Sequence, residues 1–359
     1  MLLCSKKLKN IAFSLLAMMV LYSTSARGKD IDQWLSITFD NDIFLGDDSG
    51  YTNGIFFSGF NAFEGDFNNN QTVLLKPLRP TMPTIDRVER EAEAFTFGQM
   101  LSTPNDISLL DPPMDEPPYG ALLFYAKSYL QVASDYADQI TTTIGVVGPT
   151  ALGKPAQTLV HKATGSEPPK GWDTQIRNEV VFSFSRGRLW RNWVSSTGNA
   201  DVLSLASADL GTLQTSLRGE IYFRYGRGLK RSFATPLLSS SRTSNPVAIE
   251  NGWYVYAGLS AGSRLRFILL DGNTFKSSRS VDYKKEYLGL TAGLSYAWER
   301  SGFAFAVSDA SLLQKIDGDK LDKVTQYGSL TYAWKLGAGS SKAHSWFLAT
   351  PDEQSERGQ

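Results

Sequence analysis

The chain has 359 residues, of which 36 are basic and 36 are acidic, so its formal net charge at neutral pH is zero. The sequence has no basic patch of the kind that binds nucleic acid, so we expect no nucleic-acid partner. The sequence holds one cysteine and two histidines. Catalysis or metal binding that needs several of these residues is therefore excluded.

Residues 1–26 are typical of a secretory signal peptide. Three lysines, Lys6, Lys7 and Lys9, precede an apolar stretch over residues 11–22, and Thr24-Ser25-Ala26 forms a small-residue cleavage site. The apolar stretch is too short to span a membrane comfortably as a helix. Because Cys4 is removed with the signal, the mature chain is predicted to have no disulfide, no thiolate metal site and no cysteine nucleophile.

The remaining chain is predicted to be all-β. Aromatic residues make up 12% of the sequence, glycines number 31, and no later apolar run is long enough for a transmembrane helix. In an exported protein this profile favours a closed antiparallel transmembrane barrel of the bacterial outer membrane, with a soluble periplasmic β-protein as the alternative. About twelve strands are expected, near residues 32–42, 51–61, 91–101, 119–131, 137–148, 177–189, 199–209, 212–225, 252–270, 284–298, 302–314 and 322–336.

Alternation of apolar and polar residues decides between these two classes. From Leu213 to Phe223 the odd positions are apolar or small, and the even positions include Arg218, Glu220 and Arg224. Residues 253–267 and 288–298 repeat the pattern, with apolar odd positions in the first and apolar even positions in the second. One face thus suits lipid and the other a polar lumen, which predicts a barrel.

The strand count also predicts which connections face outward. With both termini in the periplasm, the connections near 43–50, 102–118, 149–176, 271–283 and 315–321 are extracellular. Two inner connections, near 62–90 and 226–251, are unusually long, which indicates either insertions or additional structure. A single barrel domain is expected over residues 27–336, followed by a polar tail at 337–359.

The first predicted hairpin is rich in oxygen ligands. It contains the run Phe39-Asp40-Asn41-Asp42-Ile43-Phe44, then two more aspartates, and then Tyr51-Thr52-Asn53-Gly54. Carboxylates with amide and backbone oxygens suit Ca²⁺, although the spacing is not that of an EF-hand. The alternative is a polar external loop with ordinary turn residues.

The extracellular connection over 149–176 holds His161 four residues after Gln157. Residues 155–163 can form a short helix, in which both side chains point from one face. Histidine accepts a proton near neutral pH, and a neighbouring amide can orient it or a water molecule. The alternative is a helical loop whose histidine is merely polar and exposed.

A serine-hydrolase motif is present but rejected. Residues 258–262, Gly-Leu-Ser-Ala-Gly, fit the nucleophile-elbow pattern, yet they lie inside an alternating strand. An elbow requires a sharp turn from strand to helix, which this context does not allow.

These motifs together resemble the lipid A 3′-O-deacylase family of outer-membrane enzymes. The resemblance runs from about Trp34 to Leu336. It rests on DNDIF followed by YTNG, on the PPYGA run at 117–121, and on IGVVGP, Q-x-x-x-H and GWDTQI in that order.

The resemblance implies a carboxylic-ester hydrolase that removes an acyl chain from lipid A, in lipopolysaccharide, at the extracellular side of the outer membrane. It implies catalytic roles for Asn41, Asp42, Thr52, Gln157 and His161, with a short helix of an outer loop against the barrel wall. Histidine would activate a water molecule, and Ca²⁺ would be bound through Asp42, with Glu167 as a further ligand. Because strict alternation places Asn41 and Asp42 on opposite faces, the strand is expected to end or bulge there.

Two other functions are considered beside this one. The first alternative is a non-catalytic barrel with a structural or adhesive role. The second is an outer-membrane phospholipase or esterase that acts on another lipid. A porin is disfavoured because a barrel of about twelve strands is narrow. As a membrane-embedded barrel, the chain is expected to need the barrel assembly machinery during biogenesis.

Overall fold

The computed structural model describes residues 30–41, 50–63, 73–82, 88–238, 251–298, 300–313 and 326–336. The predicted signal peptide and the predicted polar tail lie outside these ranges. Among the described residues, no helix is both long enough and apolar enough to cross a membrane.

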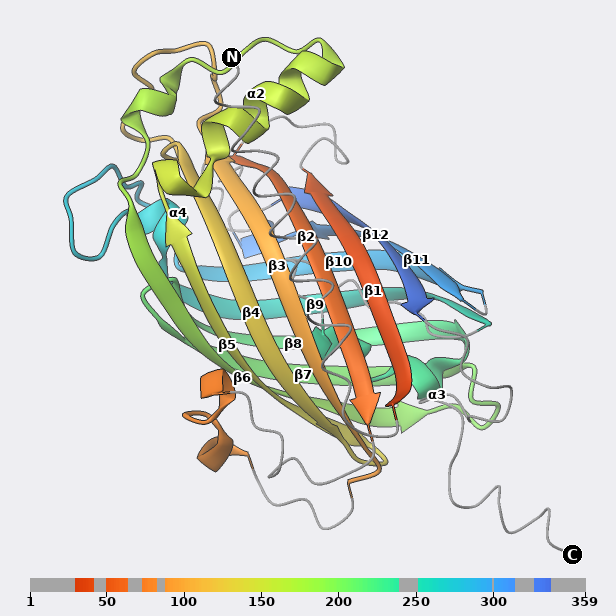
Figure 1. The fold of residues 1–359 in the computed structure, drawn as a ribbon. Helices are drawn as coiled ribbons and strands as arrows, with labels where there is room; N and C mark the ends of the chain where they lie inside the picture. Colours follow the sequence, from red (N-terminus) through yellow and green to blue (C-terminus); the bar gives the residue numbers. More distant parts are fainter. Residues whose placement is uncertain are drawn as a thin grey trace, which may run out of the picture.

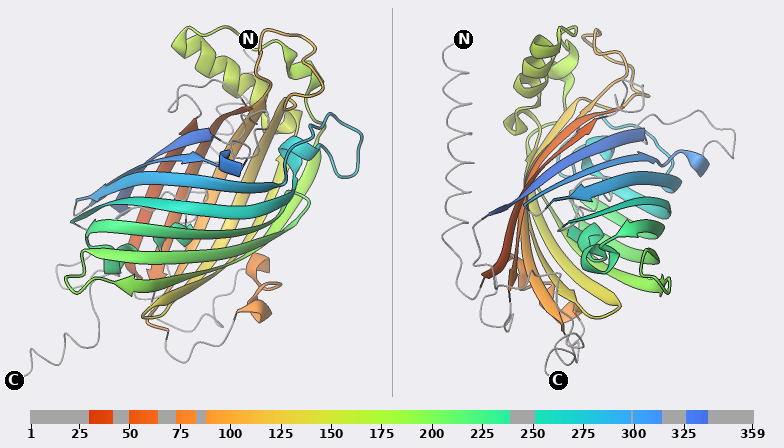
Figure 2. Two further views of the ribbon diagram at one scale, coloured as in Figure 1. Left: turned by 180° about the vertical axis from the view of Figure 1, so that it is seen from behind. Right: turned by 90° about the vertical axis from the view of Figure 1, so that its right-hand side faces the viewer.

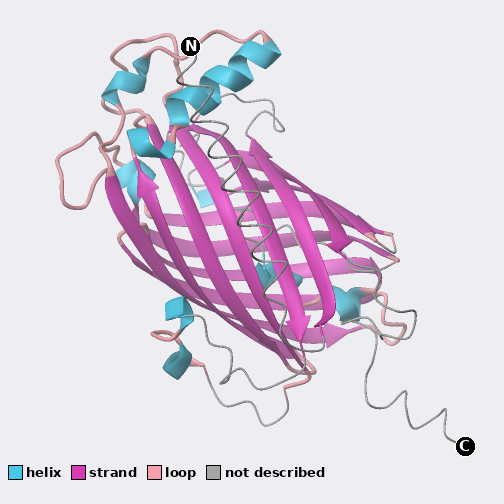
Figure 3. Cartoon of the chain, in the orientation of Figure 1, coloured by secondary structure: helices cyan, strands magenta, loops and turns pink. Residues whose placement is uncertain are grey.

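Twelve antiparallel strands within the described ranges form a closed barrel (Figures 1 and 3). Each strand pairs with its neighbours in the chain, and β1 also pairs with β12, so that no sheet edge is left open. The strands are β1 (Asp30–Asn41), β2 (Gly50–Phe63), β3 (Arg90–Thr103), β4 (Gly120–Val132), β5 (Tyr136–Val147), β6 (Glu179–Val194), β7 (Ala200–Gly211), β8 (Gln214–Arg227), β9 (Gly252–Phe267), β10 (Glu286–Ala297), β11 (Ser301–Asp309) and β12 (Gln326–Leu336). This order confirms the predicted fold class.

Most strand ends lie close to the predicted ones, with two clear differences. β6 continues to Val194, beyond the end expected near 189, because a bulge between Arg191 and Trp193 lets its pairing with β7 continue. β11 stops at Asp309 rather than near 314, since the Asp309 carboxylate accepts a hydrogen bond from the backbone N–H of Ser311 at 2.9 Å and turns the chain.

The predicted faces are correct along most of β8. Leu217 is 59% exposed, and Ile221 and Phe223 are also exposed, as expected of residues that face lipid. The polar positions Ser216 and Arg224 are buried in the barrel interior. The interior is therefore polar and the outer surface apolar along this strand, as in membrane barrels.

At the extracellular end of β8 and β9 the predicted facing is wrong for two residues. Leu213 and Phe267 were expected to face lipid, but both are buried and line the lumen. The pairing of β8 with β9 skips Leu265, so the alternation changes phase there and Phe267 turns inward. Leu213 precedes β8, in the turn from β7, and packs against Phe267 and its neighbours.

Short helical segments occupy the connections (Figure 3). They are the 3₁₀ turns η3 (Val73–Leu75), η4 (Arg79–Thr81), η5 (Pro149–Ala151), η6 (Gly171–Thr174) and η7 (Thr235–Leu238), and the helices α2 (Gly153–Thr164), α3 (Leu229–Ser232) and α4 (Ile268–Asp271). The connections that carry α2 and α4 lie at one end of the barrel, and α3 lies toward the other (Figure 1). The predicted division of the loops between two sides is thus confirmed.

The connection after β8 folds into the lumen (Figure 2). Leu229, Phe233 and Leu237 pack against inward-facing residues of the wall such as Leu203. The buried Arg224 side chain holds this segment, because it donates a hydrogen bond to the Leu229 carbonyl at 2.9 Å. The long connection predicted at 226–251 therefore contains a plug for the periplasmic end.

At the extracellular end, α4 lies across the mouth of the barrel. Leu269 and Leu270 are buried in a cluster with Leu122 of β4 and Leu213. A side chain placed on Gly120 would lie 3.1 Å from Leu269, so β4 and α4 are in close contact. Apolar packing thus fills both ends of the lumen.

The other long connection, predicted at 62–90, lies partly on the outer surface of the wall. We call its described part, Val73–Met82, the periplasmic strap. Leu75 and Met82 pack against Tyr129 of β4 and Ile140 of β5. The Thr142 hydroxyl donates a hydrogen bond to the Leu74 carbonyl at 2.6 Å. The strap therefore covers polar and charged groups of the outer wall from lipid.

Candidate active site

The connection between β5 and β6 packs against the outer face of the barrel (Figure 1). Met100 of β3 pairs with Leu122 of β4, and both face the lumen. The next pair along the strands, Leu101 and Ala121, therefore faces outward. Leu101 and Ala121 form one buried cluster with Ala151 and Trp172. We call residues 149–174 the extracellular cover, since they shield this part of the wall from solvent and lipid.

A wall residue fixes the start of this cover. Gln99 of β3 shares the outward phase of Leu101, and its Nε2 donates a hydrogen bond to the Ala151 carbonyl at 2.6 Å. Gly153 then brings α2 close to the wall, because a Cβ there would lie 2.6 Å from the Ala121 Cβ. Both contacts hold the first turn of α2 in place against the barrel.

The predicted helix is present, and it orients both predicted side chains. α2 contains Gln157 and His161 four residues apart, so they share one helix face. Gln157 is fully buried, and its Oε1 accepts a hydrogen bond from the Trp172 indole N–H at 2.7 Å. The Gln157 Nε2 is also buried and finds no hydrogen-bond partner among the described residues.

His161 is partly exposed and is held by the chain that follows the helix. Its Nδ1 lies 2.5 Å from the Glu167 carbonyl oxygen. Gly165, with a φ of 77°, ends α2 in the left-handed conformation and turns the chain back toward the imidazole. Since a carbonyl only accepts hydrogen bonds, Nδ1 carries the proton in the neutral ring, and Nε2 is the ring nitrogen without a proton.

Asn41 belongs to the same outward-facing row as the wall under the cover. It pairs with Asn53 of β2, which pairs with Leu101 of β3, which pairs with Ala121 of β4. Paired residues share a face, and neighbouring strands lie about 4.8 Å apart, so Asn41 is roughly 10 Å along the wall from Leu101. Asn53, between them, is buried although it faces outward.

The two remaining hairpin residues are only partly defined. β1 runs to Asn41, and the end or bulge expected between Asn41 and Asp42 lies outside the described residues. Asp42 itself lies outside the described residues. Thr52 is the extra residue of a bulge in β2, between Tyr51 paired with Ser102 and Asn53 paired with Leu101.

The predicted metal ligands are not brought together in the described part of the chain. Within it, no three histidine, cysteine or acidic side chains are grouped so as to hold a metal ion. Glu167 has an exposed side chain, and the contact that the structure shows for it is the one from its backbone carbonyl to His161. Its predicted role as a ligand therefore stays a prediction, as does that of Asp42.

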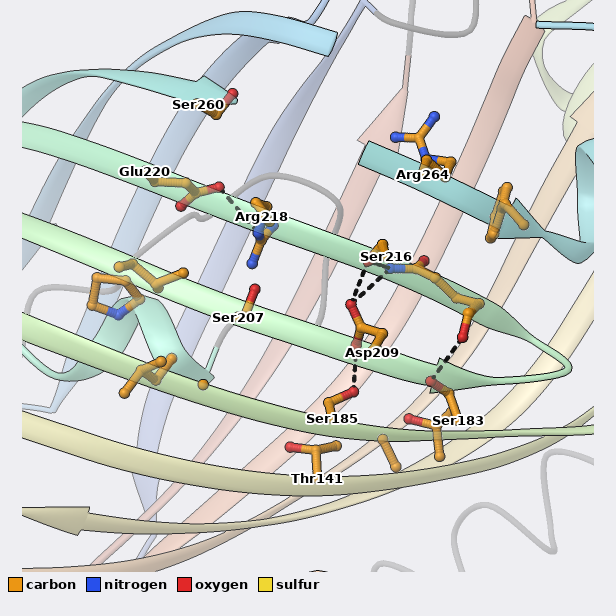
Figure 4. Close-up of a pocket in the computed structure, with 18 of the residues that line it drawn as sticks. Thr141, Ser183, Ser185, Ser207, Asp209, Ser216, Arg218, Glu220, Ser260 and Arg264 are labelled. Carbon is orange, nitrogen blue, oxygen red and sulfur yellow. Dashed lines mark hydrogen bonds and ion pairs between the residues drawn. The ribbon is translucent and has the colours of Figure 1, made fainter. Parts of the chain in front are cut away.

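A second polar site lies in the lumen, in a chamber of about 260 Å³ (Figure 4). Asp209 accepts hydrogen bonds from Ser185 at 2.5 Å and from Ser216 at 2.7 Å, and Arg218 pairs with Glu220. These groups satisfy one another, and the chamber lies between the periplasmic plug and α4. A bulky lipid in the outer leaflet has no described route into it, so the extracellular cover is the better candidate.

Sequence reasoning missed three residues of the candidate site. Trp172 lies in the GWDTQI motif, but its contact with Gln157 links two parts of a loop that no local pattern connects. Gln99 was expected only as a strand residue, and Asn53 only as part of the YTNG motif without a role of its own. Which of the outward-facing residues lie near the cover depends on where the loop packs on the wall. Strand alternation does not specify this.

The comparisons with known proteins agree with this architecture. The family model of outer membrane protein LpxR matches residues 11–336. The chain belongs to this family. LpxR is the lipid A 3′-O-deacylase family that the sequence motifs resemble, and the protein is accordingly an outer-membrane barrel.

Three solved structures are similar to the chain, and the first of them shows the same fold. LpxR from Salmonella typhimurium matches with a TM-score of 0.64 and 17% sequence identity, over 84% of this chain and 99% of that one. The translocator domain of the autotransporter NalP from Neisseria meningitidis matches with a TM-score of 0.37 and 10% identity, over 91% and 98% of the two chains. A KdgM porin gives a TM-score of 0.33 and 6% identity, over 85% and 99%. No curated protein sequence matches the chain.

Proposed function

We propose that this LpxR-family protein is a Ca²⁺-dependent hydrolase that removes an ester-linked acyl chain from lipid A in the outer leaflet. The observation that carries the proposal is the geometry of His161. Its Nδ1 is held by the Glu167 carbonyl at 2.5 Å, which fixes the orientation of the imidazole on a helix packed against the outer wall. A non-catalytic barrel has no need of a histidine fixed in this way.

The position of the site suits a membrane lipid. The extracellular cover lies on the outer face of the barrel, so a lipid could reach the edge of the cover by lateral diffusion without entering the lumen. Apolar packing around the plug and α4 makes the lumen an unsuitable route. The proposed substrate therefore meets the enzyme at the extracellular side of the outer membrane.

The proposed reaction begins with His161. Its Nε2 takes a proton from a water molecule as the water oxygen attacks the ester carbonyl carbon. The resulting imidazolium keeps its Nδ1 hydrogen bond to the Glu167 carbonyl. When the tetrahedral intermediate collapses, the carbon–oxygen ester bond breaks, and His161 returns the proton to the leaving sugar oxygen. The products are a fatty acid and a free hydroxyl group, and the histidine is neutral again.

The other predicted residues surround this reaction in the proposal. Asn41 and Thr52 lie at the extracellular ends of β1 and β2 and would contact the substrate along the outward-facing row. The buried Gln157 amide would donate a hydrogen bond to the reacting ester or to the water molecule. These roles are supported by the placement of Asn41 and by the free donor of Gln157.

Calcium is a further part of the proposal. The run from Asn41 to Asp48 offers amide and carboxylate oxygens, which are the ligands that Ca²⁺ prefers. Asp42 would bind the ion, with Glu167 as a second candidate, because its carboxylate is exposed on the same cover as His161. When bound, Ca²⁺ would supply Lewis-acid stabilisation of the negative oxygen that forms during hydrolysis. We also propose that the barrel assembly machinery inserts the chain into the membrane.

Mass spectrometry of lipid A tests the proposed function. A Gram-negative host without its own lipid A deacylase would express either the wild-type chain or His161→Ala at matched levels in the outer membrane. We expect wild-type cells to lose the mass of one acyl chain from lipid A and the variant cells to keep it. Unchanged lipid A together with hydrolysis of phospholipid vesicles by the purified protein would favour the phospholipase alternative instead.

A further inference from the structure

The contact between Trp172 and Gln157 determines which end of the amide is available. The indole N–H only donates, so the atom that it meets at 2.7 Å acts as the acceptor, the amide oxygen of Gln157. Both side chains are fully buried. The Gln157 NH₂ group therefore points away from Trp172 with two N–H donors.

These donors have no acceptor among the described residues. The Gln157 Nε2 is buried and without a hydrogen-bond partner there. Buried polar groups are normally paired, and an unpaired one is costly. A buried donor in a helix that carries the proposed base is well placed to meet an oxygen atom of the substrate.

Trp172 is held by the wall and not by α2 alone. Its ring packs on Tyr119 with centroids 5.0 Å apart, and both rings belong to the cluster formed with Leu101 and Ala121. Gly153 makes the approach of α2 possible, since a Cβ there would lie 2.3 Å from the Trp172 ring. The Trp172 indole is thus held in place by the wall, and its hydrogen bond orients the Gln157 amide of α2.

We propose that Trp172 is a positioning residue that holds Gln157 with its N–H donors directed to the reacting ester oxygen. The inference rests on the proposed deacylase function and deepens it. It assigns Gln157 the role of a donor to the developing negative charge, since the amide oxygen, which could accept a hydrogen bond or bind a cation, faces the indole. Such donors act mainly in the transition state, so their loss lowers kcat more than it raises KM.

A double-mutant cycle tests this inference with purified protein in detergent and lipid A as substrate. The four proteins are wild type, Trp172→Phe, Gln157→Ala and the double variant. We expect Gln157→Ala to lower kcat about 10²-fold, within the usual range for removal of one such donor. Trp172→Phe keeps an aromatic ring and removes the N–H, and we expect a loss of about tenfold because the amide is then free to rotate.

The decisive result is the double variant. If Trp172 acts through Gln157, adding Trp172→Phe to Gln157→Ala causes no further loss, because nothing remains to be positioned. A double variant whose loss equals the product of the two single losses would overturn the inference and assign Trp172 a packing role. Trp172→Phe with wild-type kcat would overturn it as well.

Gln157→Glu is the matched variant for the donor. A carboxylate still accepts the Trp172 hydrogen bond but has no N–H to offer, so we expect it to be at least as impaired as Gln157→Ala. Full activity of Gln157→Glu would contradict the donor role. Trp190→Phe, at an exposed position on the outer surface of β6, controls for the loss of an indole elsewhere. Heat-modifiable electrophoretic mobility would show that each barrel is folded.

Failure of this inference differs from failure of the proposed function. If the wild-type protein leaves lipid A intact under all conditions, the proposed function is wrong and the inference falls with it. If Gln157→Ala is inactive while Trp172→Phe is fully active, the deacylase function stands and only the positioning role is wrong.

Discussion

The periplasmic strap and the extracellular cover both pack on the outer wall of this barrel, but their buried polar groups differ in how they are paired. Under the periplasmic strap, Lys127 pairs with Glu93 at 2.6 Å, and Tyr129 and Gln131 both donate to one oxygen of Glu91. The second oxygens of both glutamates accept no hydrogen bond from the described residues, but each carboxylate already has a strong partner.

In the extracellular cover, by contrast, the buried side chain of Gln157 is not fully paired. The Gln157 NH₂ group has no partner in the described part of the chain, although it is fully buried. A cover whose carboxylates each have a partner stabilises the wall, whereas a fully buried amide donor without one is suited to a ligand. The comparison therefore predicts a structural role for the strap and supports the proposal of a chemical role for the extracellular cover.

The largest expected effect in this comparison is at His161. Replacing it with alanine removes the proposed base, and we expect a loss of about 10²–10⁴-fold in deacylation rate. Lys162→Ala is the matched control, because Lys162 is the next residue of α2 and is exposed. The rate of acyl release from lipid A, measured for both variants, checks this. Equal rates in the two variants would remove His161 from the mechanism.

Loss of the metal is expected to have the next largest effect. Asp42→Ala should lower the rate about 10²–10³-fold, comparable to loss of one stabiliser of the oxyanion. Excess chelator should have the same effect on the wild type, and added Ca²⁺ should restore activity better than Mg²⁺, which demands a stricter geometry. Turnover in chelator at the rate seen with Ca²⁺ would show that the reaction does not need the ion.

The strap should affect stability and not catalysis. Leu75 is fully buried against Tyr129 and Ile140, so Leu75→Ala should lower the free energy of unfolding by about 2–5 kcal/mol. Lys76→Ala, at the exposed next position, should leave it unchanged. Denaturant unfolding in lipid vesicles, together with the deacylation rate, measures both quantities. A Leu75→Ala protein that is stable but inactive would reverse the roles assigned to the two covers.

The smallest expected effect is on stability, at a position of the outer wall that neither segment covers. Leu217 of β8 faces outward and is 59% exposed, so Leu217→Arg should cost about 2–4 kcal/mol in the membrane. Lys127 also faces outward, but it is buried beside Thr142, to which the strap bonds, and Glu93 neutralises it. Ser216→Arg, which points into the polar chamber beside Asp209, should be milder. Equal destabilisation by both arginines, measured as above, would contradict the assigned facing.

The sequence determined the barrel because its signals are local. Alternation with a period of two depends only on which residues face lipid and which face the lumen, and it correctly located all twelve strands. It failed at Phe267, where a bulge at Leu265 changes the phase, because a single extra residue leaves no mark in composition. The helix with Gln157 and His161 was predictable for the same reason, since it follows from spacing within one segment.

Only the tertiary structure decided where that helix packs. The sequence placed α2 on the extracellular side but did not say that Leu101 and Ala121 of the outer wall would receive it, or that Trp172 would bind the Gln157 amide. Nor did it show that the connection after β2 covers Tyr129 and Ile140 while the one after β8 fills the lumen. These contacts join residues far apart in the chain. They are fixed by the fit of buried surfaces and by the pairing of buried polar groups, which no local pattern encodes.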